Sequence, residues 1–201
     1  NRVDNVKHLI TDYKVDVGNE MLHRNALLKN ADGSLLYYDD KDVSLCPAFD
    51  GILSDKDIED YRGHATKTEN EMWWYGCCVP IYPYPSYHME DNLPSAMLIC
   101  WMMAEYGIVG NLYWSMNCWP TVEDPYKITN CGYGANGEGI LCYPGRVYGV
   151  DGPVSSLRME AIRDGNEDYE IIKDLQKKYA VKGQDFNAKF KKLRKNLYTL
   201  S

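Results

Sequence analysis

The feature that most constrains the fold of this chain is a regular alternation between two kinds of apolar segment. Short segments rich in β-branched and aromatic residues end at Gly or Pro, and longer segments between them carry apolar residues at helical spacing. One strand and one helix recur about every 30 residues, the length of a βαβ unit, which favours a parallel sheet. The sequence therefore predicts an α/β protein with about four parallel strands, over residues 14–17, 42–46, 71–77 and 108–114.

Capping residues mark the ends of two of the intervening helices. Ser54 and Asp57 form an acidic variant of the capping box, and Gly107 follows the most apolar helical segment. Residues 19–30 have helical spacing but stay ambiguous, and residues 120–153 are predicted as a Gly-rich loop. Helices are predicted over residues 2–12, 55–68, 92–106 and about 155–179, the last with an interruption at Gly165.

The order of these elements predicts the C-terminal half of a (β/α)8 TIM-type barrel. The chain opens with the helix over residues 2–12 and so enters the pattern after a missing strand; a start at Asn1 without Met also suggests a cut piece. We expect residues 1–201 to form one partial barrel domain. Such barrels carry their sites on the loops that follow the strands, and a half barrel has open sheet edges through which it could self-associate.

The charge and the hydropathy of the chain disfavour two classes of partner, nucleic acids and membranes. Its net charge of −7 disfavours binding to a nucleic-acid backbone, and no run of about 18 apolar residues predicts a transmembrane helix. The basic stretch at residues 181–201 is predicted as an amphipathic helix whose lysines face solvent. The apolar residues at helical spacing that would dock it are Phe186, Phe190, Leu193 and Leu197.

The cysteines give no sign of a metal site. Their number, seven, is odd, and neither a CxxC motif nor a Cys/His ligand spacing occurs. We therefore expect no metal and no other cofactor. Several cysteines fall in predicted strands or helices, and buried thiols favour a reducing, cytoplasmic compartment. An extracytoplasmic location stays open because the N-terminus is missing.

The aromatic composition has two interpretations of equal weight. The chain has 17 Tyr and 5 Trp beside only 3 Phe. Tyr and Trp join an apolar face to a hydrogen-bonding edge, which suits a wet binding site, although Tyr also serves as core filler. Several of these rings lie on or just after two predicted strands. The predicted substrate-binding residues are Trp74, Tyr75, Tyr113, Trp114, Asn117 and Trp119.

Five ordered motifs carry a family resemblance. They are WWYGCC at 73–78, GNLYWS at 110–115, GEGILCYPG at 137–145, GPVSSLRME at 152–160 and RDGNEDYE at 163–170. Together they resemble the C-terminal part of the glycoside hydrolase family 123 catalytic domain, also called the domain of unknown function 4091 family, over about residues 43–175. The chain departs from the family pattern at Glu138, where Asp is usual, and at Asn166, where an aliphatic residue is usual.

The resemblance implies a TIM-barrel enzyme that hydrolyses β-linked N-acetylgalactosaminides by substrate-assisted retention. In that mechanism the 2-acetamido oxygen of the sugar attacks the anomeric carbon, an Asp polarises the acetamide, and the adjacent Glu is general acid and then base. No Asp-Glu dipeptide occurs in this sequence. We therefore expect the catalytic pair to lie outside the chain, which leaves the catalytic residues unknown and the chain inactive alone. The alternative is a non-catalytic carbohydrate-binding or scaffold module.

Four further expectations concern single residues. Glu20 follows a predicted strand, where barrel glycosidases often carry an acid/base, but a carboxylate at a helix N-terminus is the simpler interpretation. The bond between Trp114 and Ser115 is a candidate non-proline cis peptide. The charged residues from Arg158 onward are predicted to form ion pairs that clamp the last helix to the barrel. His88 lies in a Tyr/Pro-rich loop and could contact substrate, but an ordinary polar loop residue is the simpler interpretation.

Overall fold

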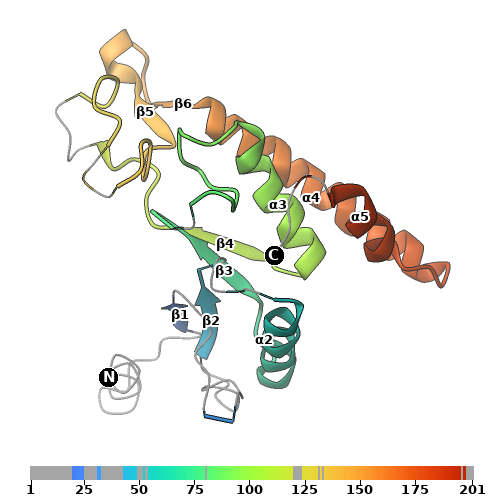
Figure 1. Ribbon diagram of the computed structural model, residues 1–201. Helices are drawn as coiled ribbons and strands as arrows, with labels where there is room; N and C mark the ends of the chain where they lie inside the picture. The colour runs from blue at the N-terminus through green and yellow to red at the C-terminus, as the bar shows by residue number, and fades with distance from the viewer. Residues whose placement is uncertain are drawn as a thin grey trace.

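Figure 1 shows the computed structural model of the protein. Among the described residues, no helix is both long enough and apolar enough to cross a membrane. The predicted strand at 14–17 and helix at 2–12 lie outside the described residues. The structure describes residues 20–24, 31–32, 43–48, 52, 54–79, 81–119, 124–130, 132, 134–195 and 197.

Four parallel strands follow one another in sequence order. β1 pairs with β2, β3 pairs with β4, and a parallel bridge between Ala48 and Tyr75 joins the two pairs. The predicted α/β class is confirmed at this level, and the ambiguous segment at 19–30 contains a strand. The strands are β1 (Glu20–Arg24), β2 (Val43–Pro47), β3 (Trp73–Gly76) and β4 (Gly110–Tyr113).

Two helix ends lie where the capping residues predict them. The Ser54 hydroxyl accepts a hydrogen bond of 3.2 Å from the backbone N–H of Asp57 at the start of α2. Gly107, with φ of 77°, ends α3 in the left-handed conformation that favours glycine. The helices are α2 (Asp55–Thr68), α3 (Pro94–Tyr106), α4 (Leu157–Val181) and α5 (Phe186–Arg194).

Gly165 does not interrupt α4, so the predicted break is wrong. The helix is continuous from Leu157 to Val181 and runs beside α3 (Figure 1). A Cβ atom at Gly165 would lie 2.9 Å from the Cα of Met97. The glycine therefore lies at a close approach between the backbones of α3 and α4, and packing compensates for its low helix propensity.

The core lies between the parallel strands and helices α2 and α3. Trp74 is the largest of its buried side chains, with 1% of its surface exposed, and Ile99, Met102 and Ile108 belong to the same core. Successive side chains of β3 alternate between its two faces, and Trp74 lies on the face that packs in the core. The interpretation of Trp74 as a substrate-binding residue therefore does not fit the structure.

The C-terminal helix α5 docks through only part of the predicted face. Phe190 is buried and Phe186 is half-buried, but Leu193 is 80% exposed and Leu197 is 53% exposed. Arg194 takes the next inward position at helical spacing and donates from Nε to the buried Glu105 carboxylate at 2.8 Å. Arg194 is therefore part of a buried ion pair within a segment whose lysines were predicted to face solvent.

The predicted loop at 120–153 contains an antiparallel hairpin. β5 (Cys142–Pro144) and β6 (Pro153–Ser155) are joined by a 3-10 helix, η3 (Gly145–Tyr148), at the top of Figure 1. A Cβ atom at Gly145 would lie 2.5 Å from the carbonyl oxygen of Gly152, so the two backbones meet only through glycine. Strands of three residues are too short to give a clear periodic pattern.

Candidate active site

A buried carboxylate lies beyond the carboxyl ends of β3 and β4. Glu138 is 1% exposed and comes from the loop that follows β4. Its Oε2 accepts hydrogen bonds from the Tyr113 hydroxyl at 2.9 Å and from His88 Nε2 at 3.1 Å. Its Oε1 accepts from the indole N–H of Trp114. We call these four residues the Glu138 cluster.

The parallel sheet brings the cluster together. Tyr113 is the last residue of β4, Trp114 follows it, and His88 lies in the segment after β3. Because β3 and β4 are parallel neighbours, the segments that leave their carboxyl ends start at the same edge of the sheet. The position of the cluster is therefore one at which α/β enzymes place their sites.

The direction of the Tyr113 hydrogen bond follows from a second contact. The backbone N–H of Gly139 donates to the Tyr113 oxygen at 2.9 Å, so the single hydroxyl hydrogen is directed to Glu138. Burial and the charge of Glu138 raise the pKa of Tyr113, which keeps the hydroxyl protonated. Tyr113 therefore acts as a fixed donor to the carboxylate.

His88 is a buried residue of the cluster, and its predicted role as ordinary loop polarity is wrong. Its Nε2 lies 2.9 Å from the carbonyl oxygen of Cys77, and because a carbonyl only accepts, Nε2 carries a hydrogen. Burial lowers the pKa of His88, but the hydrogen bonds to Glu138 and to the Cys77 carbonyl, together with the charges of Glu138 and Asp91, raise it by more in sum, and the net shift is upward. The pair favours an imidazolium beside a carboxylate.

Both glycines that flank Glu138 are required by close approaches. Gly139 has φ of 69°, and a Cβ atom there would lie 2.5 Å from Cζ2 of the Trp114 ring. Gly137 has φ of 74°, and a Cβ atom there would lie 2.4 Å from Nη1 of Arg158. The backbone of the Gly-Glu-Gly motif thus fits between an indole ring and a guanidinium group.

Arg158 fixes this turn through backbone carbonyls. It is 8% exposed and donates from Nη1 to the carbonyl oxygens of Tyr87 at 2.6 Å and Gly137 at 2.9 Å. Its Nη2 donates to the carbonyl of Ile140. The predicted clamp of α4 is present, but for Arg158 its partners are carbonyl groups and not carboxylates.

Of the other charged residues in the predicted clamp, some form exposed ion pairs within α4 and one contacts α3. Arg163 forms an exposed ion pair of 2.6 Å with Glu160. Asp168 accepts a hydrogen bond of 2.9 Å from the indole N–H of Trp101 on α3, which does join α4 to the rest of the protein.

The Trp114 ring is anchored at its nitrogen edge and 36% exposed elsewhere. The peptide bond to Ser115 is trans, so the expected cis bond is wrong; the cis bond within the described residues joins Tyr82 and Pro83. Tyr75 is half-buried at the same edge of the sheet, where burial, together with the neighbouring Cys77 thiol, raises its pKa.

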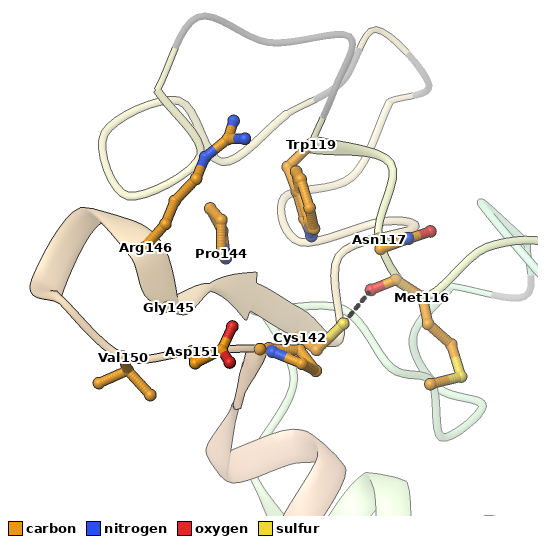
Figure 2. Close-up of a pocket in the computed structure, with 11 residues that line it drawn as sticks. Met116, Asn117, Trp119, Cys142, Pro144, Gly145, Arg146, Val150 and Asp151 are labelled. Atoms are coloured by element: carbon orange, nitrogen blue, oxygen red, sulfur yellow. Dashed lines mark hydrogen bonds between the residues drawn. The ribbon is translucent and has the colours of Figure 1, made fainter.

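Asn117 and Trp119 line a separate pocket of about 650 Å³ (Figure 2). Its walls are the segment from Met116 to Trp119 and the β5–η3–β6 hairpin. The indole N–H of Trp119 has no hydrogen-bond partner within the described part of the chain. The remaining lining residues are Cys142, Pro144, Gly145, Arg146, Val150, Asp151, Gly152 and Pro153.

The six predicted binding residues therefore lie in three places: Trp74 in the core, Tyr75, Tyr113 and Trp114 at the sheet edge, and Asn117 and Trp119 in the pocket. Sequence reasoning missed Glu138 and His88. The Gly-Glu-Gly motif offered a signal for Glu138, because glycines on both sides of a carboxylate indicate a turn whose backbone is closely approached by other groups. No local pattern marks His88.

Glu20 does not occupy an acid/base position. It is the first residue of β1 and pairs with Val43 at the amino end of the strand, opposite to the edge that carries the Glu138 cluster. Nor does it begin a helix, so the simpler interpretation of the sequence is also wrong. Within the described ranges, no group of three or more His, Cys, Asp or Glu side chains could hold a metal ion.

Comparison with known protein families identifies the family of this chain. A search of curated proteins returned no match. Residues 11–175 match the family described as "Glycoside hydrolase 123, catalytic domain". The match includes all five motifs and all residues of the Glu138 cluster, and it begins earlier than the resemblance seen in the sequence. The chain therefore belongs to glycoside hydrolase family 123.

Proposed function

We propose that the chain forms the substrate-binding wall of a hydrolase for β-linked N-acetylgalactosaminides, built as half of a (β/α)8 barrel. The observation that carries this proposal is the Trp114 ring, held by its N–H on the buried Glu138 carboxylate at the carboxyl edge of parallel strands. A partly exposed ring at this edge offers the flat apolar surface against which the apolar face of a pyranose packs.

The support beneath the ring is rigid. Glu138 is itself fixed by Tyr113 and His88, and the flanking turn is fixed by Arg158. A ring that is already oriented before the sugar arrives loses little conformational freedom on binding, and the sugar in turn is held in one orientation. Tyr75 lies at the same edge of the sheet, half-buried beside the Cys77 thiol.

Glu138 itself supports the site and does not serve as acid/base. A general acid must reach the glycosidic oxygen, but Glu138 is 1% exposed and its two oxygens already accept three hydrogen bonds. We assign proton transfer to an Asp-Glu pair outside these 201 residues, because the sequence contains no such dipeptide. Glu138 is thus a positioning residue.

The proposed reaction is substrate-assisted retention. The acetamide oxygen attacks the anomeric carbon while the glycosidic C–O bond breaks, and the leaving oxygen takes a proton from the general acid. Water then attacks the same carbon, gives a proton to the resulting base and restores the acetamide. The residues of this chain bind the sugar and orient its acetamide toward the carbon.

Titration calorimetry with methyl N-acetyl-β-galactosaminide tests the binding half of this proposal. We expect binding by the chain, weakened at least about tenfold by Trp114→Ala and less by Trp114→Phe, which keeps a ring without the N–H. Leu193→Ala, at an 80% exposed position on α5, is the control and leaves affinity unchanged. Absence of binding by the unmodified chain contradicts the proposal.

A chromogenic N-acetyl-β-galactosaminide tests the catalytic half. We expect no turnover by the 201-residue chain and turnover by a protein that also carries the Asp-Glu pair. Turnover by the chain alone contradicts the assignment of the pair. Binding without turnover even in the presence of the pair identifies a non-catalytic carbohydrate-binding module instead.

A further inference from the structure

We propose that the pocket lined by Trp119 is a second sugar-binding subsite, which holds the neutral sugar on the leaving-group side of the substrate. This inference rests on the proposed function, because it places the N-acetylgalactosamine residue at Trp114. The sequence suggested one site with Trp119 and Asn117 at its rim. The structure instead gives these two residues a pocket of their own.

The pocket is large enough for a ligand and has a defined wall. Its volume of about 650 Å³ falls within the roughly 300–1,000 Å³ of small-molecule sites. One side is the segment that continues from β4 through Met116 to Trp119, and the other is the β5–η3–β6 hairpin (Figure 2). The hairpin is held closed by the glycine contact between Gly145 and Gly152.

The Trp119 indole points to the kind of ligand. Its N–H group is buried in the pocket wall without a hydrogen-bond partner among the residues that the structure describes. A buried donor without an acceptor costs about 1–3 kcal/mol, and the N–H of a buried Trp usually has a partner. A sugar hydroxyl is an acceptor of the right size, and the ring beside it is a surface for the apolar face of the sugar.

The remaining lining has the composition of a neutral saccharide site. Pro144 and Val150 offer apolar surface, while Arg146, Asp151 and Asn117 offer donors and acceptors. One arginine and one aspartate give no net charge, so an uncharged sugar satisfies both without excess charge. A strongly anionic or cationic ligand would meet one repulsive side chain.

Backbone hydrogen bonds place this pocket beside the first site. Cys118 N–H donates to the Gly139 carbonyl at 2.8 Å, and Leu141 N–H donates to the Met116 carbonyl at 2.8 Å. Gly139 is also the residue on which the Trp114 ring packs. Trp119 comes five positions after Trp114, so their Cα atoms are at most about 18 Å apart, a span within reach of one oligosaccharide.

Indole ¹⁵N–¹H resonances test this directly, because each tryptophan gives its own signal and the chain has five. The Trp114 and Trp119 signals are assigned by their loss in Trp114→Phe and Trp119→Phe, and the remaining signals report whether each variant is folded. The ligands are methyl N-acetyl-β-galactosaminide and the disaccharides in which N-acetylgalactosamine is β-linked 1→3 or 1→4 to methyl galactoside.

We expect the monosaccharide to shift the Trp114 signal alone and at least one disaccharide to shift both signals. That disaccharide should bind about tenfold more tightly than the monosaccharide, and Trp119→Ala should remove this difference while monosaccharide affinity stays unchanged. Trp119→Phe, which keeps a ring without the N–H, should remove part of this difference in affinity.

Three outcomes contradict the inference. If the monosaccharide shifts both signals, the tryptophans share one site. If both disaccharides shift Trp114 but leave Trp119 unmoved, with no gain in affinity, the second subsite is wrong and the proposed function stands. If no sugar moves Trp114, the proposed function fails, and the second subsite fails with it.

Discussion

Glu138→Gln is the substitution whose consequences the structure specifies most fully. Glutamine has nearly the same shape, but it replaces one acceptor oxygen with an NH2 donor. If the amide nitrogen takes the place of Oε2, it faces His88 Nε2, which must donate because it also contacts the Cys77 carbonyl. If it takes the place of Oε1, it faces the Trp114 N–H. In either orientation a donor faces a donor.

The magnitude follows from these contacts. A buried donor left without an acceptor costs about 1–3 kcal/mol, and the loss of charge assistance in the remaining bonds adds about 1 kcal/mol. We expect the free energy of unfolding to fall by about 2–4 kcal/mol. For a protein of this size that lowers Tm by roughly 5–15 °C. Calorimetry and urea unfolding measure both quantities.

Glu167→Gln is the matched control. Its side chain is 72% exposed and its contact with Arg163 is 3.9 Å long, so we expect a change within about 0.5 kcal/mol. A second measurement follows the His88 imidazole by NMR. The pKa of His88 should fall in Glu138→Gln, because burial, which lowers it, remains while the contact that raises it is lost. Unchanged stability together with an unchanged His88 pKa would refute the reasoning.

Three further predictions concern pH and packing. The raised pKa of His88 gives a stabilisation that is complete below its unfolded-state pKa of about 6.5 and is lost as pH rises through its folded-state pKa. Tm should therefore fall over this pH range in the unmodified protein, and His88→Gln should make that fall smaller. Parallel curves of Tm against pH for the two proteins would contradict this. Gly165→Ala should lower the free energy of unfolding by about 1–3 kcal/mol despite the better helix propensity of Ala, because its Cβ would lie 2.9 Å from the Cα of Met97; a more stable variant in urea unfolding would show that the helices adjust. Arg194→Met should cost about 3–5 kcal/mol in the same assay by removing the guanidinium group that pairs with the buried Glu105 carboxylate. The added change Glu105→Met should recover most of that loss, and equal losses in the single and double variants would exclude the buried charge as the cause.

The sequence by itself determined the features that depend on near neighbours and on order. Ser54 begins α2 and Gly107 ends α3 through hydrogen bonds to residues three or four positions away, and both positions were correctly predicted. The alternation of segments predicted parallel strands, and the five ordered motifs predicted the family. The short hairpin of β5 and β6 was missed because three-residue strands carry almost no periodicity.

Only the tertiary structure decided what each aromatic and charged side chain does. Trp74 and Trp114 look alike in the sequence, yet the pleat of β3 turns the first into the core, and a carboxylate 24 residues from the second fixes it at the sheet edge. Likewise, 50 residues separate His88 from Glu138. Contacts over such separations depend on how parallel strands align their ends, and no local pattern encodes that alignment.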